Sequence, residues 1–201
     1  TLGIVSQATY NTVVDHPHKA SAFIVFKDVR EACRAAAVLR RETDVDAVEL
    51  FDRASLTQCE GHEAIIGLVP TIADAPKTGA ALLIECRGAT DDELNGNIKE
   101  VTTALDNAGM DYLNDREKTY PFSKDESVYK VYLDVRKGLI PLVGSSREPG
   151  TSVLIEDVAC EVDKLGDMTQ DLIDMFERFG YDDASCMGHA LEGNLHLVFS
   201  Q

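Results

Sequence analysis

Two histidines near the end of the sequence lie in the segment GHALEGNLH at residues 188–196, which also holds a carboxylate, an amide and two glycines. Short alternating segments flank this motif, so it has the pattern of a β-hairpin turn. If the hairpin is centred between Glu192 and Gly193, His189 and His196 lie directly opposite each other, with Cβ atoms about 4.5–5.5 Å apart. Two imidazoles at that spacing can bind one metal ion.

A structural role for the same histidines remains open. They can satisfy hydrogen bonds within a buried hairpin, or face opposite sides of it if the ALEGN connection adopts another loop geometry. A catalytic zinc site needs roughly three protein ligands and an open position, whereas the motif supplies two nitrogens. Glu156 and Glu192 are candidates for the third ligand by residue type alone.

Other segments give weaker signals. His16 and His18 flank a proline in a stretch typical of an exposed turn, and His62 has no compact set of metal-binding neighbours. The segment GSSREPG at residues 144–150 superficially resembles a phosphate-binding loop. It lacks the lysine and hydroxyl of that motif, so we interpret it as a turn.

Composition restricts the class of protein. The chain has 201 residues, of which 44% are hydrophobic and 27% charged, and its formal net charge is −16. Such a charge opposes binding to nucleic acid or to membrane headgroups. Five widely spaced cysteines without a CxxC pair indicate neither a disulfide framework nor a thiolate metal site. With no long apolar run or secretion signal, we expect a soluble cytoplasmic protein.

Hydrophobic periodicity predicts strands that alternate with helices. Strands are expected at residues 4–14, 22–26, 47–51, 80–86, 153–158, 184–187 and 195–200. Helices are expected at residues 28–43, 90–108, 126–139 and 164–179. Thr90 and Glu93 form a capping box, while Gly109 and Gly180 are helix stop signals. This order predicts an α+β fold with helices packed on one face of the sheet.

Three segments carry a resemblance to a known family. GHALEGNLH is similar to a GHxGDGNxH motif, AVELFDRASL at residues 47–56 resembles a cap-domain segment, and TLGI at residues 1–4 resembles a TLGI/TLGF segment. All three motifs are found in the FAD-linked oxidases that include D-lactate and D-2-hydroxyglutarate dehydrogenases, within the vanillyl-alcohol oxidase superfamily. The resemblance covers essentially the whole chain. It is closest to large bacterial members that fuse an FAD domain, a cap domain and an iron–sulfur region.

The resemblance implies a flavoprotein oxidoreductase that converts a D-2-hydroxy acid to a 2-oxo acid, with hydride transfer to FAD. Residues 1–13 would end the FAD-binding domain, and residues 14–201 would form a substrate (cap) domain with a ferredoxin-like antiparallel sheet. His189 and His196 match two ligands of a divalent metal, zinc or manganese, that polarises the substrate. A histidine of this pair could instead accept a proton, but a metal-bound nitrogen cannot do both.

Further site residues follow from the same resemblance. Arg136 matches an arginine that binds the substrate carboxylate, a task suited to the guanidinium fork. Asn194 is expected to support substrate binding. The segment Thr1, Leu2 and Gly3 matches backbone that approaches FAD.

Departures from the family pattern leave the substrate open. Residues 154–156 read Leu-Ile-Glu where relatives place a substrate-binding lysine just before the match to Asp157. Val198 replaces an asparagine that contacts substrate in some relatives, and Glu192 replaces the motif's aspartate. The family's third metal ligand, a glutamate in an EHG motif, is expected downstream of this sequence.

The resemblance also implies partners. They are the flavin domain of the same polypeptide, a small D-2-hydroxy acid, and an electron acceptor reached through an iron–sulfur domain or a quinone. The resemblance is also compatible with a homo-oligomer and with a full-length protein that is peripheral to the inner membrane. Without the flavin domain's pyrophosphate-binding loop, we expect the isolated chain to be inactive. The rival hypotheses are a ferredoxin-like binding or oligomerisation module and a metallohydrolase that uses the same histidines.

Overall fold

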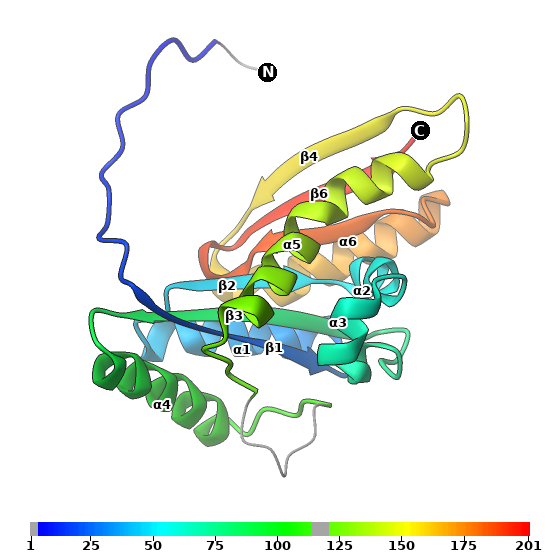
Figure 1. Ribbon diagram of the computed structural model, residues 1–201. Coiled ribbons are helices and arrows are strands. Elements are labelled where there is room, and N and C mark those ends of the chain that lie inside the picture. The colour runs from blue at the N-terminus through cyan, green and yellow to red at the C-terminus, as the bar shows by residue number, and fades with distance from the viewer. Residues whose placement is uncertain (1–3, 114–120) are drawn as a thin grey trace.

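One antiparallel sheet organises the computed structural model, which describes residues 4–113 and 121–201. Its strand order is β1-β3-β2-β5-β6-β4, and every neighbouring pair is antiparallel (Figure 1). The strands are β1 (His18–Phe26), β2 (Ala47–Phe51), β3 (Ala80–Gly88), β4 (Val153–Ala159), β5 (Ser185–His189) and β6 (Asn194–Ser200). The α+β class and the antiparallel sheet are therefore confirmed.

Helices cover both faces of the sheet, which corrects the expectation of one covered face (Figure 1). One layer comprises α1 (Val29–Glu42), α4 (Asp91–Asn107) and α6 (Leu165–Phe179). The other comprises α2 (Arg53–Glu60), α3 (Glu63–Leu68) and α5 (Glu126–Ser146). In β1, Ile24 and Phe26 pack in the first core, while Phe23 and Val25 pack in the second. The continuous apolar run of this strand fits burial on both sides.

Helix ends follow the expected local chemistry. The Thr90 hydroxyl accepts a hydrogen bond from the Glu93 backbone N–H at 3.2 Å, which begins α4. Gly180 adopts a left-handed conformation with φ 77° and ends α6. Helix α5 is longer than predicted because it continues past Pro141 to Ser146. The expected turn at residues 144–150 is therefore helical in its first part.

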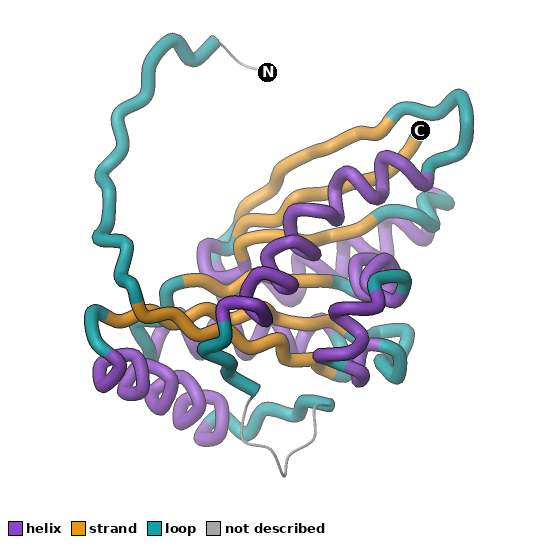
Figure 2. Tube along the Cα trace, viewed as in Figure 1, coloured by secondary structure: helices purple, strands orange, loops and turns teal. Residues whose placement is uncertain are grey.

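The N-terminal segment does not form the strand that its sequence pattern predicts. Residues 4–17 form an extended loop that leaves the body of the molecule, as Figure 2 shows. Ile4 is 96% exposed and Val13 is 89% exposed, so the expected strand at residues 4–14 is wrong. Alternating apolar residues make a strand only where a neighbouring strand pairs with their backbone groups.

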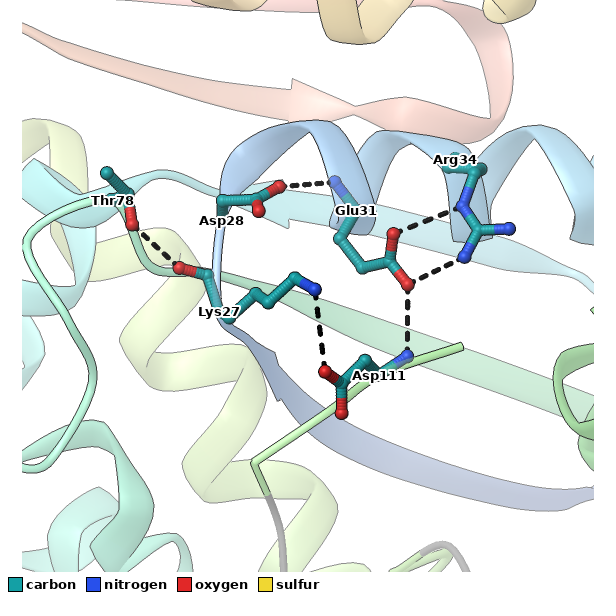
Figure 3. Close-up of polar contacts among 6 residues, drawn as sticks. All are labelled: Lys27, Asp28, Glu31, Arg34, Thr78 and Asp111. Atoms are coloured by element: carbon teal, nitrogen blue, oxygen red, sulfur yellow. Dashed lines mark hydrogen bonds and ion pairs between the residues drawn. The ribbon is translucent and has the colours of Figure 1, made fainter. Parts of the chain in front are cut away.

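A polar network at the start of α1 fixes the segment that follows α4 (Figure 3). Asp28 caps α1 by accepting the backbone N–H of Glu31 at 2.8 Å. The Glu31 carboxylate in turn accepts hydrogen bonds from Arg34 Nη2 at 2.7 Å and from the Asp111 backbone N–H at 3.0 Å. Lys27 reaches the Asp111 carboxylate at 3.4 Å. These contacts anchor the chain where it leaves the α4 layer.

No helix within residues 4–113 and 121–201 is both long and apolar enough to cross a membrane.

Candidate functional site

Strands β5 and β6 form the predicted hairpin with a different register. Met187 lies opposite His196, so the direct pairing expected for His189 and His196 is wrong by two residues. The connection is a short 3₁₀ turn, Ala190–Glu192, followed by Gly193. Because a two-residue shift preserves the side-chain face, the histidines remain on one face as diagonal neighbours. Their ring centroids are 5.2 Å apart, with the rings nearly perpendicular at 84°.

The two glycines of the motif have backbone roles. Gly193 adopts φ 65°, and a Cβ atom there would overlap the carbonyl oxygen of Cys160. The Gly193 carbonyl accepts the Cys160 backbone N–H at 2.9 Å, which joins the turn to the end of β4. Gly188 has φ 148° and lies against the backbone of residues 194–196. Both positions therefore require glycine for conformation and close approach.

Glu49 connects His189 to Arg136. It lies on β2 directly opposite His189 on β5, and its side chain is 11% exposed. Its Oε1 atom is 3.0 Å from His189 Nδ1 and 2.7 Å from Arg136 Nη2. Arg136 reaches this point from α5, on the helical layer that covers the site's face of the sheet. Glu49 was not predicted as a site residue, although a glutamate inside the apolar run AVELF is the signal of a buried, paired charge.

His196 has a carboxylate partner of its own. Its Nδ1 atom is 3.1 Å from Asp157 Oδ1, on the neighbouring strand β4. The Asn194 amide donates to the same oxygen at 2.9 Å and to the Val158 carbonyl at 3.1 Å. Asp157 is 62% exposed. Asn194 therefore contacts the partner of His196.

Both histidines thus use Nδ1 toward a carboxylate. When Nδ1 carries the proton, Nε2 presents a lone pair, which is the arrangement in which histidines ligate metal ions. The pair fits two nitrogen ligands of a divalent metal. Across the described ranges, no group of three or more His, Cys, Asp or Glu side chains could hold a metal ion. Glu156 and Glu192 consequently do not complete a three-ligand group with the histidines.

A pocket of about 180 Å³ brings Arg136, His189 and His196 together, whereas the predicted substrate-binding residue Asn194 is not part of its lining. Its polar lining consists of Glu49, Arg136, Lys137, His189 and His196. The rest of its wall consists of Leu50, Phe51, Leu139, Met187 and Gly188. A larger pocket of about 460 Å³ between α2 and α6 contains none of the predicted site residues. Thr1, Leu2 and Gly3 lie outside the described residues, so their contact with FAD stays a prediction.

A buried carboxyl outside this pocket, Asp52, links two of the strands that carry the site, β2 and β5. It accepts hydrogen bonds from the backbone N–H of Ser55 at 2.9 Å, the Ser55 hydroxyl at 2.7 Å and the Cys186 backbone N–H at 2.7 Å. Burial raises the pKa of Asp52 above its usual range, against the opposing effect of these donors. Asp52 therefore caps α2 and also ties the end of β2 to β5.

The remaining histidines and the cysteines do not join this pocket. His18 Nδ1 lies 3.5 Å from the carboxylate of Asp91, which also pairs with Lys124 at 3.1 Å. All five cysteines are free thiols. Burial raises the pKa of Cys33 and Cys59 to about 12, which keeps these thiols protonated and unreactive.

The chain belongs to the family of FAD linked oxidases, C-terminal domain, whose sequence model matches residues 15–201. The motif-based expectation of an FAD-linked oxidoreductase domain is therefore confirmed at the level of the family. In members of this family, such a domain pairs with an FAD-binding domain. No match is found among curated proteins.

Solved structures show the same fold at low sequence identity. Alkyldihydroxyacetonephosphate synthase aligns with a TM-score of 0.65 and 11% identity, over 92% of this chain and 37% of that chain. A 4-ethylphenol oxidase from Gulosibacter chungangensis gives 0.55 and 11%, over 92% and 39%. p-Cresol methylhydroxylase with bound substrate gives 0.53 and 13%, over 92% and 39%. The chain thus spans well under half the length of these proteins.

Proposed function

We propose that this chain is the substrate-binding cap of an FAD-dependent dehydrogenase that oxidises a D-2-hydroxy acid, of the D-lactate or D-2-hydroxyglutarate type, to a 2-oxo acid. The observation that carries the proposal is the shared pocket of Arg136, His189 and His196. Family membership supports the flavin-linked part of the proposal, and the arginine beside two imidazoles supports an anionic, hydroxylated substrate.

The residues of the pocket divide the task of substrate binding. Arg136 offers five N–H donors, of which Glu49 engages one nitrogen, so the guanidinium retains donors for a substrate carboxylate. His189 and His196 direct Nδ1 to carboxylates and keep Nε2 for a divalent metal, zinc or manganese. When bound, the flavin supplies the hydride acceptor and the metal supplies polarisation of the substrate hydroxyl.

The apolar wall has a complementary role. Phe51, Leu139 and Met187 are buried and line the pocket beside the charged residues, so part of its wall is apolar. In such surroundings the attraction between Arg136 and a carboxylate is stronger than in water. We infer that the onward electron acceptor, an iron–sulfur domain or a quinone, lies outside this chain, as does the flavin.

The test is anaerobic flavin reduction in a polypeptide that joins this chain to an FAD-binding domain. We expect D-lactate, D-2-hydroxyglutarate or a related D-2-hydroxy acid to bleach the flavin absorbance. The His189→Ala substitution should abolish bleaching while the protein retains FAD. His62→Ala is the matched control, because this exposed histidine at the start of α3 lies outside the pocket.

Two outcomes would contradict the proposal. One is a wild-type protein with bound FAD and zinc or manganese that no D-2-hydroxy acid reduces. The other is an unchanged rate of reduction in His189→Ala. Hydrolase activity of the zinc-bound chain without flavin would favour the metallohydrolase hypothesis instead.

A further inference from the structure

We propose that Glu49 is a positioning residue that fixes the proton of His189 on Nδ1 and holds Arg136 at the same pocket. The inference rests on the proposed function only where it assigns His189 to the metal and Arg136 to the substrate. The position of the proton is a property of the chain alone, so it can be tested without flavin, metal or substrate.

The geometry begins with the sheet. Glu49 and His189 are directly paired residues of β2 and β5, so their side chains leave the same face side by side. Arg136 approaches from α5 above that face and meets Glu49 Oε1 at 2.7 Å. The Oε1 atom of Glu49 thus contacts His189 from the sheet and Arg136 from the covering helix.

The distances decide where the imidazole proton lies. His189 Nδ1 is 3.0 Å from Glu49 Oε1 and 3.4 Å from Arg136 Nη2. The guanidinium has only donors and the carboxylate only acceptors. Nδ1 can therefore either donate to Glu49 or accept from Arg136, and the shorter distance favours donation to Glu49. The Nε2 atom of His189 then carries the lone pair.

Charge supports the same arrangement. Burial of a carboxylate is costly unless a positive partner and hydrogen bonds accompany it. Arg136 is permanently charged and supplies that partner, so the Glu49 carboxylate does not need a second positive charge from His189. With its side chain 11% exposed, Glu49 has little water to replace either contact.

The experiment measures the tautomer of each histidine by long-range ¹H–¹⁵N correlation spectra of the 201-residue chain at pH 8, without added metal. We expect His189 to carry its proton mainly on Nδ1 in the wild type. Glu49→Met keeps the length of the side chain but removes its oxygens, and should move the proton predominantly to Nε2. Glu49→Gln keeps one acceptor oxygen and should give an intermediate population.

Controls separate a local hydrogen bond from a general loss of charge. Glu156→Met also removes one carboxylate, on the opposite face of β4 from Asp157, and should leave the His189 tautomer unchanged. The His196 signals should not change in Glu49→Met. A wild-type His189 with its proton on Nε2 would overturn the inference even if no Glu49 variant folds. An unchanged tautomer in folded Glu49→Met would overturn it equally.

A zinc titration of the same proteins distinguishes this inference from the proposed function. Loss of a hydrogen-bond partner behind a metal-binding histidine typically weakens metal affinity 10–100-fold, and we expect that reduction for Glu49→Met. Wild-type His189 signals that do not respond to zinc would count against metal binding in the proposed function. The tautomer would still decide the role of Glu49. Equal zinc affinity of wild type and Glu49→Met, with His189 responding in both, would contradict the positioning role.

Discussion

The two histidines of the pocket have the same kind of partner in different surroundings. His189 bonds to Glu49 between two central strands, under α5, where the carboxylate is 11% exposed. His196 bonds to Asp157 on β4, the edge strand, where the carboxylate is 62% exposed. Water can replace a partner at the edge far more readily than in the interior. The comparison indicates that the Glu49 carboxylate is held more firmly than the Asp157 carboxylate, although the His189 side chain is itself more exposed (41%) than that of His196 (29%).

The largest expected effect concerns Asp52, which caps α2 and ties the end of β2 to β5. Asp52→Ala removes the cap of α2 and leaves the buried Cys186 N–H without its acceptor. We expect a loss of about 2–4 kcal/mol in the free energy of unfolding, measured by urea denaturation. Asp125→Ala removes an exposed cap at α5 in the same way and should cost clearly less. Equal losses would show that Asp52 stabilises the fold no more than an exposed helix cap does.

Thiol labelling compares a cysteine in the interior of the sheet, Cys186, directly with one near its edge strand, Cys160. Cys186 lies within β5 and is fully buried, whereas Cys160 follows β4 and is partly exposed. Burial raises the pKa of both thiols, and that of Cys186 by far more. At pH 8 we expect iodoacetamide to label Cys160 at least ~100-fold faster, with Cys186 labelled only through local opening. Mass spectrometry of the labelled peptides gives both rates, and similar rates would break the comparison.

A smaller effect is expected in the coupling energy between each carboxylate, Glu49 or Asp157, and a polar side chain that contacts it. A double-mutant cycle of Glu49→Gln with Arg136→Gln should give a coupling of about 1 kcal/mol in the free energy of unfolding, because the Glu49 carboxylate is 11% exposed although Arg136 is 35% exposed. The cycle of Asp157→Asn with Asn194→Ala should give less than about 0.5 kcal/mol. A coupling at the edge as large as the interior coupling would contradict the proposed difference.

The smallest effect is the pH dependence of Asp52. Burial raises the pKa of this carboxyl in the folded chain, so the folded state binds its proton at a higher pH than the unfolded state does. Its contribution to stability is therefore greatest below the unfolded pKa, near 4, and declines as pH rises through the folded pKa. The stability difference between wild type and Asp52→Asn should fall from pH 4 to pH 7. A difference that rises over this range would show a lowered pKa.

Sequence patterns predict local structure well where one principle dominates. The strand at residues 47–51 is reproduced without change as β2, and Gly180 ends α6 as expected. The histidine pair is also brought together in one pocket with Arg136. These features depend on periodicity, on helix stop signals and on a motif that spans few residues.

Features that depend on distant pairing escape such reasoning. The register of the hairpin is set by the turn and by β2 and β4, which pair with its two outer sides. The role of Glu49 appears only when residues 49, 136 and 189 meet, and no local pattern links them. The apolar alternation of residues 4–14 failed for the same reason, because no strand within the described residues pairs with it.

The strand order has a consequence for how the pocket forms. The hairpin of β5 and β6 lies between β2 and β4, so it joins two parts of the sheet that otherwise share no edge. Glu49 and Asp157 precede this hairpin in the chain. Their contacts with His189 and His196 form only when the hairpin pairs with β2 and β4. Such long-range closure is slow compared with helix formation. We therefore expect assembly of the pocket to be a late event in folding, one that reports insertion of the central hairpin.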